Sequence, residues 1–165
     1  MEINLKNKTA WVFGGSRGIG RAIALELAKV GANILLIARD KIALQHVKEE
    51  LCARRQQEHD FISIDLSKTS LLREVLTKYR NTSAVDIVIN NTGGPVAGLA
   101  HTAELEEYSS AFNQHLLASQ VITTIALRAM KKRGFGRVIN IISTSVKQPI
   151  YGLGVSNTIR GAVAN

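Results

Sequence analysis

Short apolar runs alternate with longer stretches of mixed character along the whole chain. The longer stretches repeat apolar residues every three or four positions, as amphipathic helices do, whereas the short runs are typical of strands buried on both faces. The pattern predicts five strands, at residues 9–13, 34–38, 61–64, 86–90 and 137–142. It predicts helices at 21–30, at 41–57, from a cap at Ser67 through Tyr79, from near Ala103 to Arg133 with a bend near Ser109, and from Ser156 onward.

The regular alternation of strand and helix predicts an α/β fold, in which helices cover both faces of a doubly wound parallel sheet. No linker, repeat or low-complexity tract divides the sequence, so we expect residues 1–165 to form a single Rossmann-like domain. Ligands of such sheets bind beyond the carboxyl ends of the strands, where the strand order reverses. The segments that follow all five predicted strands therefore contain the candidate site residues.

The most informative segment is the turn between the first predicted strand and the first predicted helix, Gly14-Gly15-Ser16-Arg17-Gly18-Ile19-Gly20. Gly14 permits a tight backbone turn that a side chain would block. Gly18 and Gly20 let a phosphate and the neighbouring strand approach the backbone, and the free N–H groups at the helix start attract negative charge. This order of strand, turn and helix predicts a nucleotide site, with a purely structural turn as the alternative.

Composition and charge narrow the possible functions. The longest apolar runs are too short to cross a bilayer and the first residues lack the apolar core of a secretory signal, so a cytoplasmic protein without a membrane partner is expected. Cys52 is the only cysteine, which excludes an internal disulfide. The net charge of +8 would suit nucleic acid, but the densest basic group, residues 131–133, lies at a predicted helix end that favours cations. We therefore expect no nucleic-acid partner.

Four motifs, taken together, resemble those of the short-chain dehydrogenase/reductase family over nearly the whole chain. Gly14-x-x-x-Gly18-x-Gly20 resembles the cofactor motif of that family. Asp65-Leu66 stands where the family places the acid that contacts the adenine ring, and Asn90-Asn91-Thr92-Gly93 resembles its Asn-Asn-Ala-Gly motif. Ser143 follows the fifth predicted strand, where the family has its catalytic serine.

The resemblance is closest to the 3-oxoacyl-carrier-protein-reductase-like members. It implies an NAD(P)-dependent oxidoreductase that interconverts a small-molecule carbonyl and an alcohol, and that assembles as a homodimer or homotetramer. The cofactor contacts that it implies are Gly14, Ser16, Arg17, Gly18, Ile19, Gly20, Arg39, Asp65, Leu66, Asn91, Thr92 and Gly93. It implies no metal.

The residues after the second predicted strand bear on the choice of cofactor. A carboxylate there binds the free ribose hydroxyls of NAD, whereas an arginine accommodates the 2′-phosphate of NADP. In the family register the selecting position is Ala38, which has no carboxylate, and Arg39 and Arg17 flank the expected phosphate. NADP is therefore expected. Asp40, which could bind a ribose, keeps NAD as the alternative.

The catalytic positions depart from the family pattern. The family donates a proton from a Tyr thirteen residues after the Ser and supports it with a Lys four residues later, but here these positions are Ser156 and Arg160. A serine hydroxyl is a much weaker acid than a phenol, and arginine does not give up its proton. Tyr151 and His115 are the remaining acid–base candidates, and an ordered water or a substrate hydroxyl is a further alternative.

Each of the two remaining candidates has a structural alternative. Tyr151 would otherwise be a surface aromatic residue in a loop. His115 falls where the family has its active-site Asn, with Asn113 taking that place if the register slips, and it would otherwise be a histidine bonded to the backbone. The catalytic set that we expect is Ser143, His115, Tyr151, Ser156 and Arg160.

The end of the chain also departs from the family. Residue 165 lies inside the last predicted helix, whereas family members continue through further strands and a segment that covers the substrate, so a C-terminally truncated fragment is expected. A catalytically inactive dinucleotide-binding protein, acting as a sensor or a partner subunit, is the alternative function because the Tyr and the Lys are both replaced.

Overall fold

Five parallel strands form one sheet in the order β3-β2-β1-β4-β5, in a computed structural model that describes residues 3–54, 56–83 and 85–165. The strands are β1 (Thr9–Phe13), β2 (Asn33–Ala38), β3 (Asp60–Ser63), β4 (Ile87–Asn90) and β5 (Arg137–Asn140). The α-helices are α1 (Gly18–Lys29), α2 (Lys41–Glu50), α3 (Thr69–Thr82), α4 (Leu105–Ala111), α5 (Ala118–Arg133) and α6 (Gly154–Ala164). This arrangement confirms the predicted α/β class and the parallel sheet.

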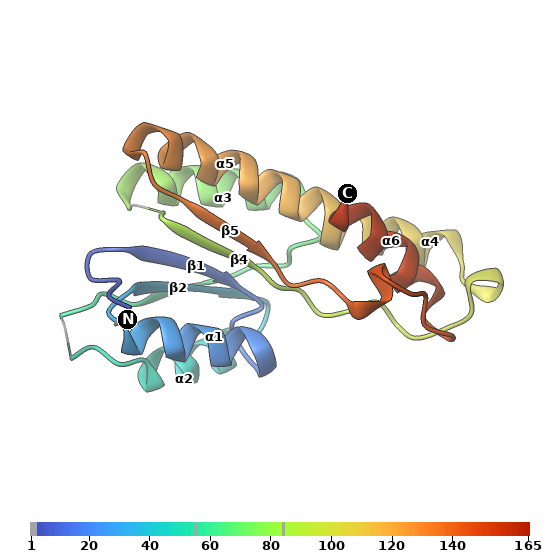
Figure 1. Cartoon of the computed structure of the whole chain (residues 1–165), viewed down its shortest axis with the longest axis horizontal. Helices are drawn as coiled ribbons and strands as arrows, with labels where there is room; N and C mark the ends of the chain where they lie inside the picture. The colour runs from blue at the N-terminus through green and yellow to red at the C-terminus, as the bar shows by residue number, and fades with distance from the viewer. Residues whose placement is uncertain (1–2, 55, 84) are drawn as a thin grey trace.

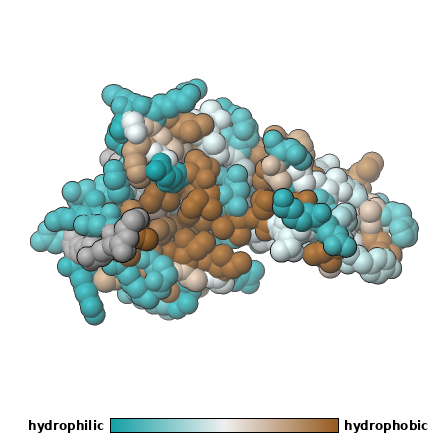
Figure 2. Space-filling model, in the orientation of Figure 1, coloured by the Kyte–Doolittle hydropathy of each residue, from teal (hydrophilic) through white to brown (hydrophobic). Residues whose placement is uncertain are grey.

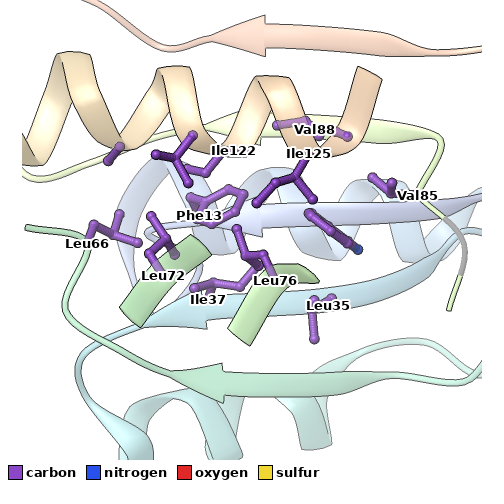
Figure 3. Close-up of a cluster of buried hydrophobic side chains, with 14 of the residues drawn as sticks. Phe13, Leu35, Ile37, Leu66, Leu72, Leu76, Val85, Val88, Ile122 and Ile125 are labelled. Atoms are coloured by element: carbon purple, nitrogen blue, oxygen red, sulfur yellow. The ribbon is translucent and has the colours of Figure 1, made fainter. Parts of the chain in front are cut away.

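Helices cover both faces of the sheet (Figure 1). Helices α1 and α2 contact β1, β2 and β3 on one face, and α3 and α5 pack together on the other. Side chains alternate along β1, so Trp11 and Phe13 point into the core under α3 and α5, while Ala10 and Val12 point toward α1 and α2. Figure 3 shows Phe13 and Ile37 meeting Leu72, Leu76, Ile122 and Ile125 in the first of these cores.

The strand order reverses between β1 and β4, because β2 and β3 follow on one side of β1 while β4 and β5 lie on the other. A crevice at the carboxyl ends of the strands is the usual consequence of such a reversal. Helices α4 and α6 lie beyond this edge, at the right of Figure 1. The elements that follow the strands are thereby gathered at one end of the molecule.

The amino ends of the strands are held together by Asp86, which lies just before β4 and is buried. Its Oδ2 accepts a hydrogen bond of 2.9 Å from the backbone N–H of Thr9. Its Oδ1 lies 3.2 Å from Arg133 and 3.8 Å from Lys8. Arg133 also donates to the carbonyl of Val85. Two cations and one amide thus balance a buried carboxylate at the end of the sheet that lies opposite the crevice.

Several predicted boundaries were wrong. Helix α2 ends at Glu50 rather than near residue 57, because Leu51 takes an extended conformation and is the last buried residue of that stretch. Ser67 does not cap α3: its amide and its hydroxyl both donate to Oδ1 of Asp65, and the N-cap residue is Lys68. Helix α6 begins at Gly154, two residues before the predicted start.

The long helix predicted between Ala103 and Arg133 is interrupted instead of merely bent. A π-helical segment, η2 (Phe112–Leu117), joins α4 to α5. Two short 3₁₀-helices, η1 (Ala100–Thr102) and η3 (Thr144–Val146), lie in or near the predicted loops. A π-bulge leaves one extra residue in a helical turn and often occurs at functional sites. Here it contains His115.

Strand β5 lies at an edge of the sheet and pairs with β4 only, within the part of the chain that the structure describes. Its residue Ile139 is 48% exposed. Figure 2, in the orientation of Figure 1, shows an apolar surface in the middle of the view, between the two helical layers. In the described part of the chain, no helix is both long and apolar enough to cross a membrane.

Candidate functional site

An open cleft of about 450 Å³ lies at the carboxyl edge of the sheet, across the reversal in strand order. It is lined by Gly14, Ser16, Arg17, Ile19, Ala38, Arg39, Asp40, Ala43, Ile64, Asp65, Leu66, Asn91, Thr92, Gly93 and Gln114. The structure thus brings together ten of the twelve residues expected to contact a cofactor. The other two, Gly18 and Gly20, shape the turn beside the cleft.

Gly14 sets the close approach of two loops under the cleft. Its φ is +62°, in the left-handed region that favours glycine. A Cβ at this position would lie 2.6 Å from both the carbonyl oxygen and the side-chain nitrogen of Asn91. The Asn91 side chain donates to the Gly14 carbonyl at 3.3 Å. The glycine turn and the loop after β4 therefore share one packed contact.

Gly18 and Gly20 differ in their surroundings. A Cβ on Gly20 would collide with the Gly14 carbonyl, so Gly20 has a packing role. Gly18 has a φ of +54°, and no atom lies within 4 Å of the position of its missing Cβ. The N-cap residue of α1, Arg17, makes no side-chain cap bond. The start of α1 thus offers backbone N–H groups beside open space, which fits a phosphate group.

Arg39 and Asp40 follow β2 and both line the cleft. Asp40 is the N-cap residue of α2, and its Oδ1 accepts a hydrogen bond of 3.0 Å from the N–H of Ala43. The Arg39 carbonyl accepts a hydrogen bond of 2.8 Å from Ser63, while its side chain is exposed at the cleft. The Asp40 carboxylate therefore already accepts a hydrogen bond from the start of α2, whereas the Arg39 guanidinium is exposed and can bind an anion.

Asp65 and Leu66 form the wall of the cleft beyond β3. Both the amide and the hydroxyl of Ser67 donate to the Asp65 carboxylate, at 2.9 and 2.8 Å. The hydrogen bond from the Ser67 N–H lowers the pKa of the Asp65 carboxyl most, and the Ser67 hydroxyl and the charges of Arg39 and Lys68 lower it further. The carboxylate is thus ionised and held in a fixed position at neutral pH.

The segment after β4 forms the other wall. Asn90 donates from its side chain to Asn140 Oδ1 at 2.8 Å, which ties the end of β4 to the end of β5. Gln114, in the π-helix, donates to the Gly93 carbonyl at 3.1 Å and lines the cleft. The sequence interpretation missed Gln114, although its place directly before the candidate His115 could have suggested it.

Three of the expected catalytic residues are buried, and two of them, His115 and Arg160, form hydrogen bonds with Thr92 of this wall. His115 is 2% exposed and Arg160 and Ser156 are each 8% exposed. His115 Nδ1 forms a hydrogen bond with the hydroxyl of Thr92. Burial and the nearby charge of Arg160 lower the pKa of His115 to about 4, so its imidazole is neutral at physiological pH.

Arg160 extends from α6 to the backbone of two loops. It donates to the carbonyl of Ile141 at 3.1 Å and to the carbonyl of Thr92 at 3.3 Å. His115 and Arg160 line a small cavity of about 10 Å³, and Thr92 lines both this cavity and the open cleft. Of the described residues, no carboxylate forms a salt bridge with Arg160.

The other two expected catalytic residues lie in the loop after β5. Ser143 is the N-cap residue of η3, and its Oγ accepts a hydrogen bond of 3.1 Å from the Ser145 N–H, which leaves the hydroxyl proton for another acceptor. Tyr151 is 89% exposed. Neither residue is among those that line the cleft, and His115, Ser156 and Arg160 do not line it either, so the structure does not gather the five expected catalytic residues around it.

Comparison with known proteins identifies the family. The sequence profile described as short chain dehydrogenase matches residues 8–164. The chain is 27% identical over 163 residues to the NADPH-dependent reductase BacG of Bacillus subtilis, covering 98% of this chain and 63% of that protein. It is 33% identical over 143 residues to the 3-oxoacyl-[acyl-carrier-protein] reductase FabG of Chlamydia trachomatis, covering 84% and 56%.

A solved structure gives the same result for the fold. The L-sorbose reductase from Gluconobacter frateurii, complexed with NADPH and L-sorbose, superposes with a TM-score of 0.92 at 26% identity. The match covers 99% of this chain and 62% of that chain. The chain thus spans roughly 56 to 63% of the length of these three relatives.

Proposed function

Because the chain belongs to the short-chain dehydrogenase family, we propose that it is an NADP(H)-linked oxidoreductase that interconverts a carbonyl compound and an alcohol. The observation that carries the proposal is one continuous open cleft that runs from Arg39, past the glycine turn, to Gly93. The open space beside Gly18 and the uncapped start of α1 fit a pyrophosphate. NADPH, when bound, supplies the hydride that reduces the carbonyl.

Different residues of the cleft would bind different parts of the dinucleotide. The amides at the start of α1 and Ser16 would hold the pyrophosphate, and Asp65 and Leu66 would flank the adenine ring. The nicotinamide end would then lie against Asn91, Thr92 and Gly93. Both walls are fixed by hydrogen bonds before a ligand binds, which lowers the entropic cost of binding.

Charge at the adenine end favours NADP over NAD. Arg17 and Arg39 line the cleft, and an arginine fork suits a phosphate. Asp40, the residue that would favour a free ribose, already accepts the Ala43 N–H at the start of α2. The NADPH named with the Gluconobacter frateurii and Bacillus subtilis reductases supports the same choice.

The proton of the reaction must come from a group other than those in the usual family positions. His115 is neutral and hydrogen-bonded to Thr92, and Arg160 keeps its proton. We assign the orientation of the substrate oxygen to Ser143, whose hydroxyl proton is not used by Ser145. Tyr151 is the phenol nearest along the chain to position 156, and it would reach a substrate only after the loop moves inward.

The test is consumption of NADPH with a panel of ketones, measured with the wild-type chain and with S143A and Y151F. We expect the wild-type chain to reduce a ketone and S143A to do so at least about a hundredfold more slowly, the loss typical when a positioned catalytic group is removed. Y151F separates the proton sources: an unchanged rate assigns the proton to water or to a substrate hydroxyl. No turnover by the wild-type chain with any ketone would contradict the proposal.

Binding without turnover is the second candidate function, and one observation favours it. Ser156 and Arg160, which replace the Tyr and the Lys, are both buried, and Arg160 holds backbone carbonyls. The double variant S156Y/R160K separates the two functions. If the wild-type chain binds NADPH without reducing a ketone, and only the double variant reduces one, the wild-type protein is a sensor or a partner subunit.

We also propose that the protein binds a small carbonyl or alcohol and associates as a homodimer or homotetramer. Exposed apolar side chains on the π-helix and α5, Phe112 and Leu127, support the second proposal, because they are 40% and 39% exposed. Sedimentation of the chain over a range of concentrations measures the assembly directly. A monomer at every concentration would contradict it.

A further inference from the structure

We propose that Arg160 and His115 are positioning residues that act on the cofactor cleft through Thr92, Arg160 holding its backbone carbonyl and His115 holding its hydroxyl. The inference rests on the proposed binding of NADP(H) and adds to it the means by which one wall of the cleft is held in place. It assigns to Arg160 a role that involves no contact with the dinucleotide.

Arg160 joins three segments that are distant in sequence. It belongs to α6, and its two donated hydrogen bonds end on the carbonyl of Thr92, after β4, and on the carbonyl of Ile141, after β5. A guanidinium presents its donors in a rigid fork, so two acceptors fixed by one arginine are also fixed relative to each other. The ends of β4 and β5 are thereby held at a set separation behind the cleft.

His115 supports the same residue from the π-helix. The bond between its Nδ1 and the Thr92 hydroxyl fixes the side chain of a residue whose backbone Arg160 already holds. Thr92 lines the open cleft, and it also lines the small cavity shared by His115 and Arg160. A displacement of either buried side chain would therefore reach the cleft through Thr92.

The segment after Thr92 has little packing to hold it. No atom lies within 4 Å of where a Cβ would stand on Gly93 or Gly94. Among the described residues, Gln114 donates to the Gly93 carbonyl at 3.1 Å, and Arg160 and His115 form hydrogen bonds with Thr92. A wall with so few apolar contacts depends on hydrogen bonds for its position, and small displacements in a binding site weaken binding strongly.

The experiment compares two ligands by calorimetric titration. NADPH spans the whole proposed site, whereas 2′,5′-ADP fills only the adenine end, which lies at Arg39 and Asp65 rather than at Thr92. The variants are R160M, R160K and H115L. The matched control is R133M, because Arg133 also donates to a backbone carbonyl, that of Val85, but at the opposite end of β4.

The inference predicts that R160M and H115L each weaken NADPH binding at least about tenfold, as expected for the loss of a charged or well-placed hydrogen bond. Binding of 2′,5′-ADP should change less than about twofold, and R133M should leave both affinities unchanged. R160K, which keeps the charge without the fork, should bind NADPH with intermediate affinity. If R160M is too unstable to titrate, R160K and H115L carry the comparison.

Amide hydrogen exchange gives a readout without any ligand. R160M, or R160K in its place, should speed exchange of the Ile141 amide, which donates to the Asn90 carbonyl at 2.8 Å where Arg160 joins the ends of β4 and β5, while R133M should not. Unchanged NADPH affinity and exchange in R160M would overturn the inference, as would equal weakening of both ligands in R160M and R133M. A wild-type chain that does not bind NADPH removes the proposed function, and the inference with it, before any substitution is compared.

Discussion

Gly14 and Gly18 both have a positive φ, yet their surroundings differ, so alanine should affect them differently. At Gly14 the backbone strain of about 1–2 kcal/mol adds to an overlap with Asn91 worth about 1–3 kcal/mol. At Gly18 only the strain applies, because no atom lies within 4 Å. Denaturant unfolding should therefore show a larger loss of stability in G14A than in G18A. The emission of Trp11, the single tryptophan, reports the transition because this side chain is fully buried.

Equal losses in the two variants would mean that the contact between Gly14 and Asn91 is not rigid. G18A has a second use, because its added methyl group would occupy space proposed for the pyrophosphate. It should retain most of its stability but bind NADPH more weakly than the wild type.

The burial of His115 predicts a pH dependence of stability. Its pKa is lowered from 6.5 to about 4 in the folded chain, so between these values the unfolded chain binds a proton that the folded chain does not. The free energy of unfolding should therefore be fully maintained above pH 6.5 and should fall as the pH is lowered toward 4. At 1.36 kcal/mol per pKa unit the fall is about 3 kcal/mol.

The measurement is urea unfolding at a series of pH values for the wild type and H115N. His59 also has a lowered pKa, chiefly through burial, and contributes in the same direction, so the difference between the two proteins isolates His115. H115N should have the shallower pH dependence. Identical slopes in the two proteins would contradict the burial of a neutral imidazole.

Individual site residues could be predicted where they directly follow a strand or form the glycine turn, because the order of strand and helix along the sequence then fixes their place. The glycine turn, Arg39, Asp65 and Asn91 follow strands whose ends must meet in a parallel sheet, and they do line one cleft. Gln114 was missed because its side chain reaches the cleft through the geometry of the π-helix, and its position directly before His115 was the one signal that could have suggested it. The position of Tyr151 was also open, since an aromatic residue in a loop can pack inward or face solvent.

At the level of elements, the strands were predicted well because each is a short apolar run, whereas helix ends depend on contacts that no local pattern contains. Residues beyond Leu51 suit a helix by propensity, but none of those described between 52 and 57 is buried, so α2 ends there. The π-helix has the same apolar spacing as a continuous helix, which is why the sequence indicated only a bend. Ser67 was mistaken for a cap because Asp65, two residues earlier, competes for its hydroxyl.

Asn157 of α6 holds the far part of the loop after β5, around Ile150, whereas Arg160 holds its start at Ile141. Asn157 donates to the Ile150 carbonyl at 2.8 Å and accepts from the Ile150 N–H at 3.4 Å. N157A should lower stability by about 1 kcal/mol and speed amide exchange at residues 150–153. T158A, which removes a neighbouring exposed bond to Gly154, is the control and should not affect that loop. Equal exchange in both variants would show that Asn157 does not hold it.

At the scale of the whole molecule, the alternation of strands and helices predicts a parallel sheet but not its strand order. The order β3-β2-β1-β4-β5 is a property of tertiary packing, and it places the reversal between β1 and β4. The cleft lies at this reversal, while the network around Asp86 closes the opposite end of the strands. The Asp86 network and the cleft thus lie at opposite ends of the same sheet, so a substitution at Arg133 should not reach the cleft.

The central claim is that this cleft binds NADP(H), and calorimetric titration of the wild-type chain with NADPH and NADH tests it most directly. Arg39 is the key variant, and R128A, an exposed position on α5, is the control. We predict one site that binds NADPH at least about tenfold more tightly than NADH, a preference that R39A removes by weakening NADPH alone. Absence of NADPH binding, or tighter binding of NADH with R39A unchanged, would contradict the account.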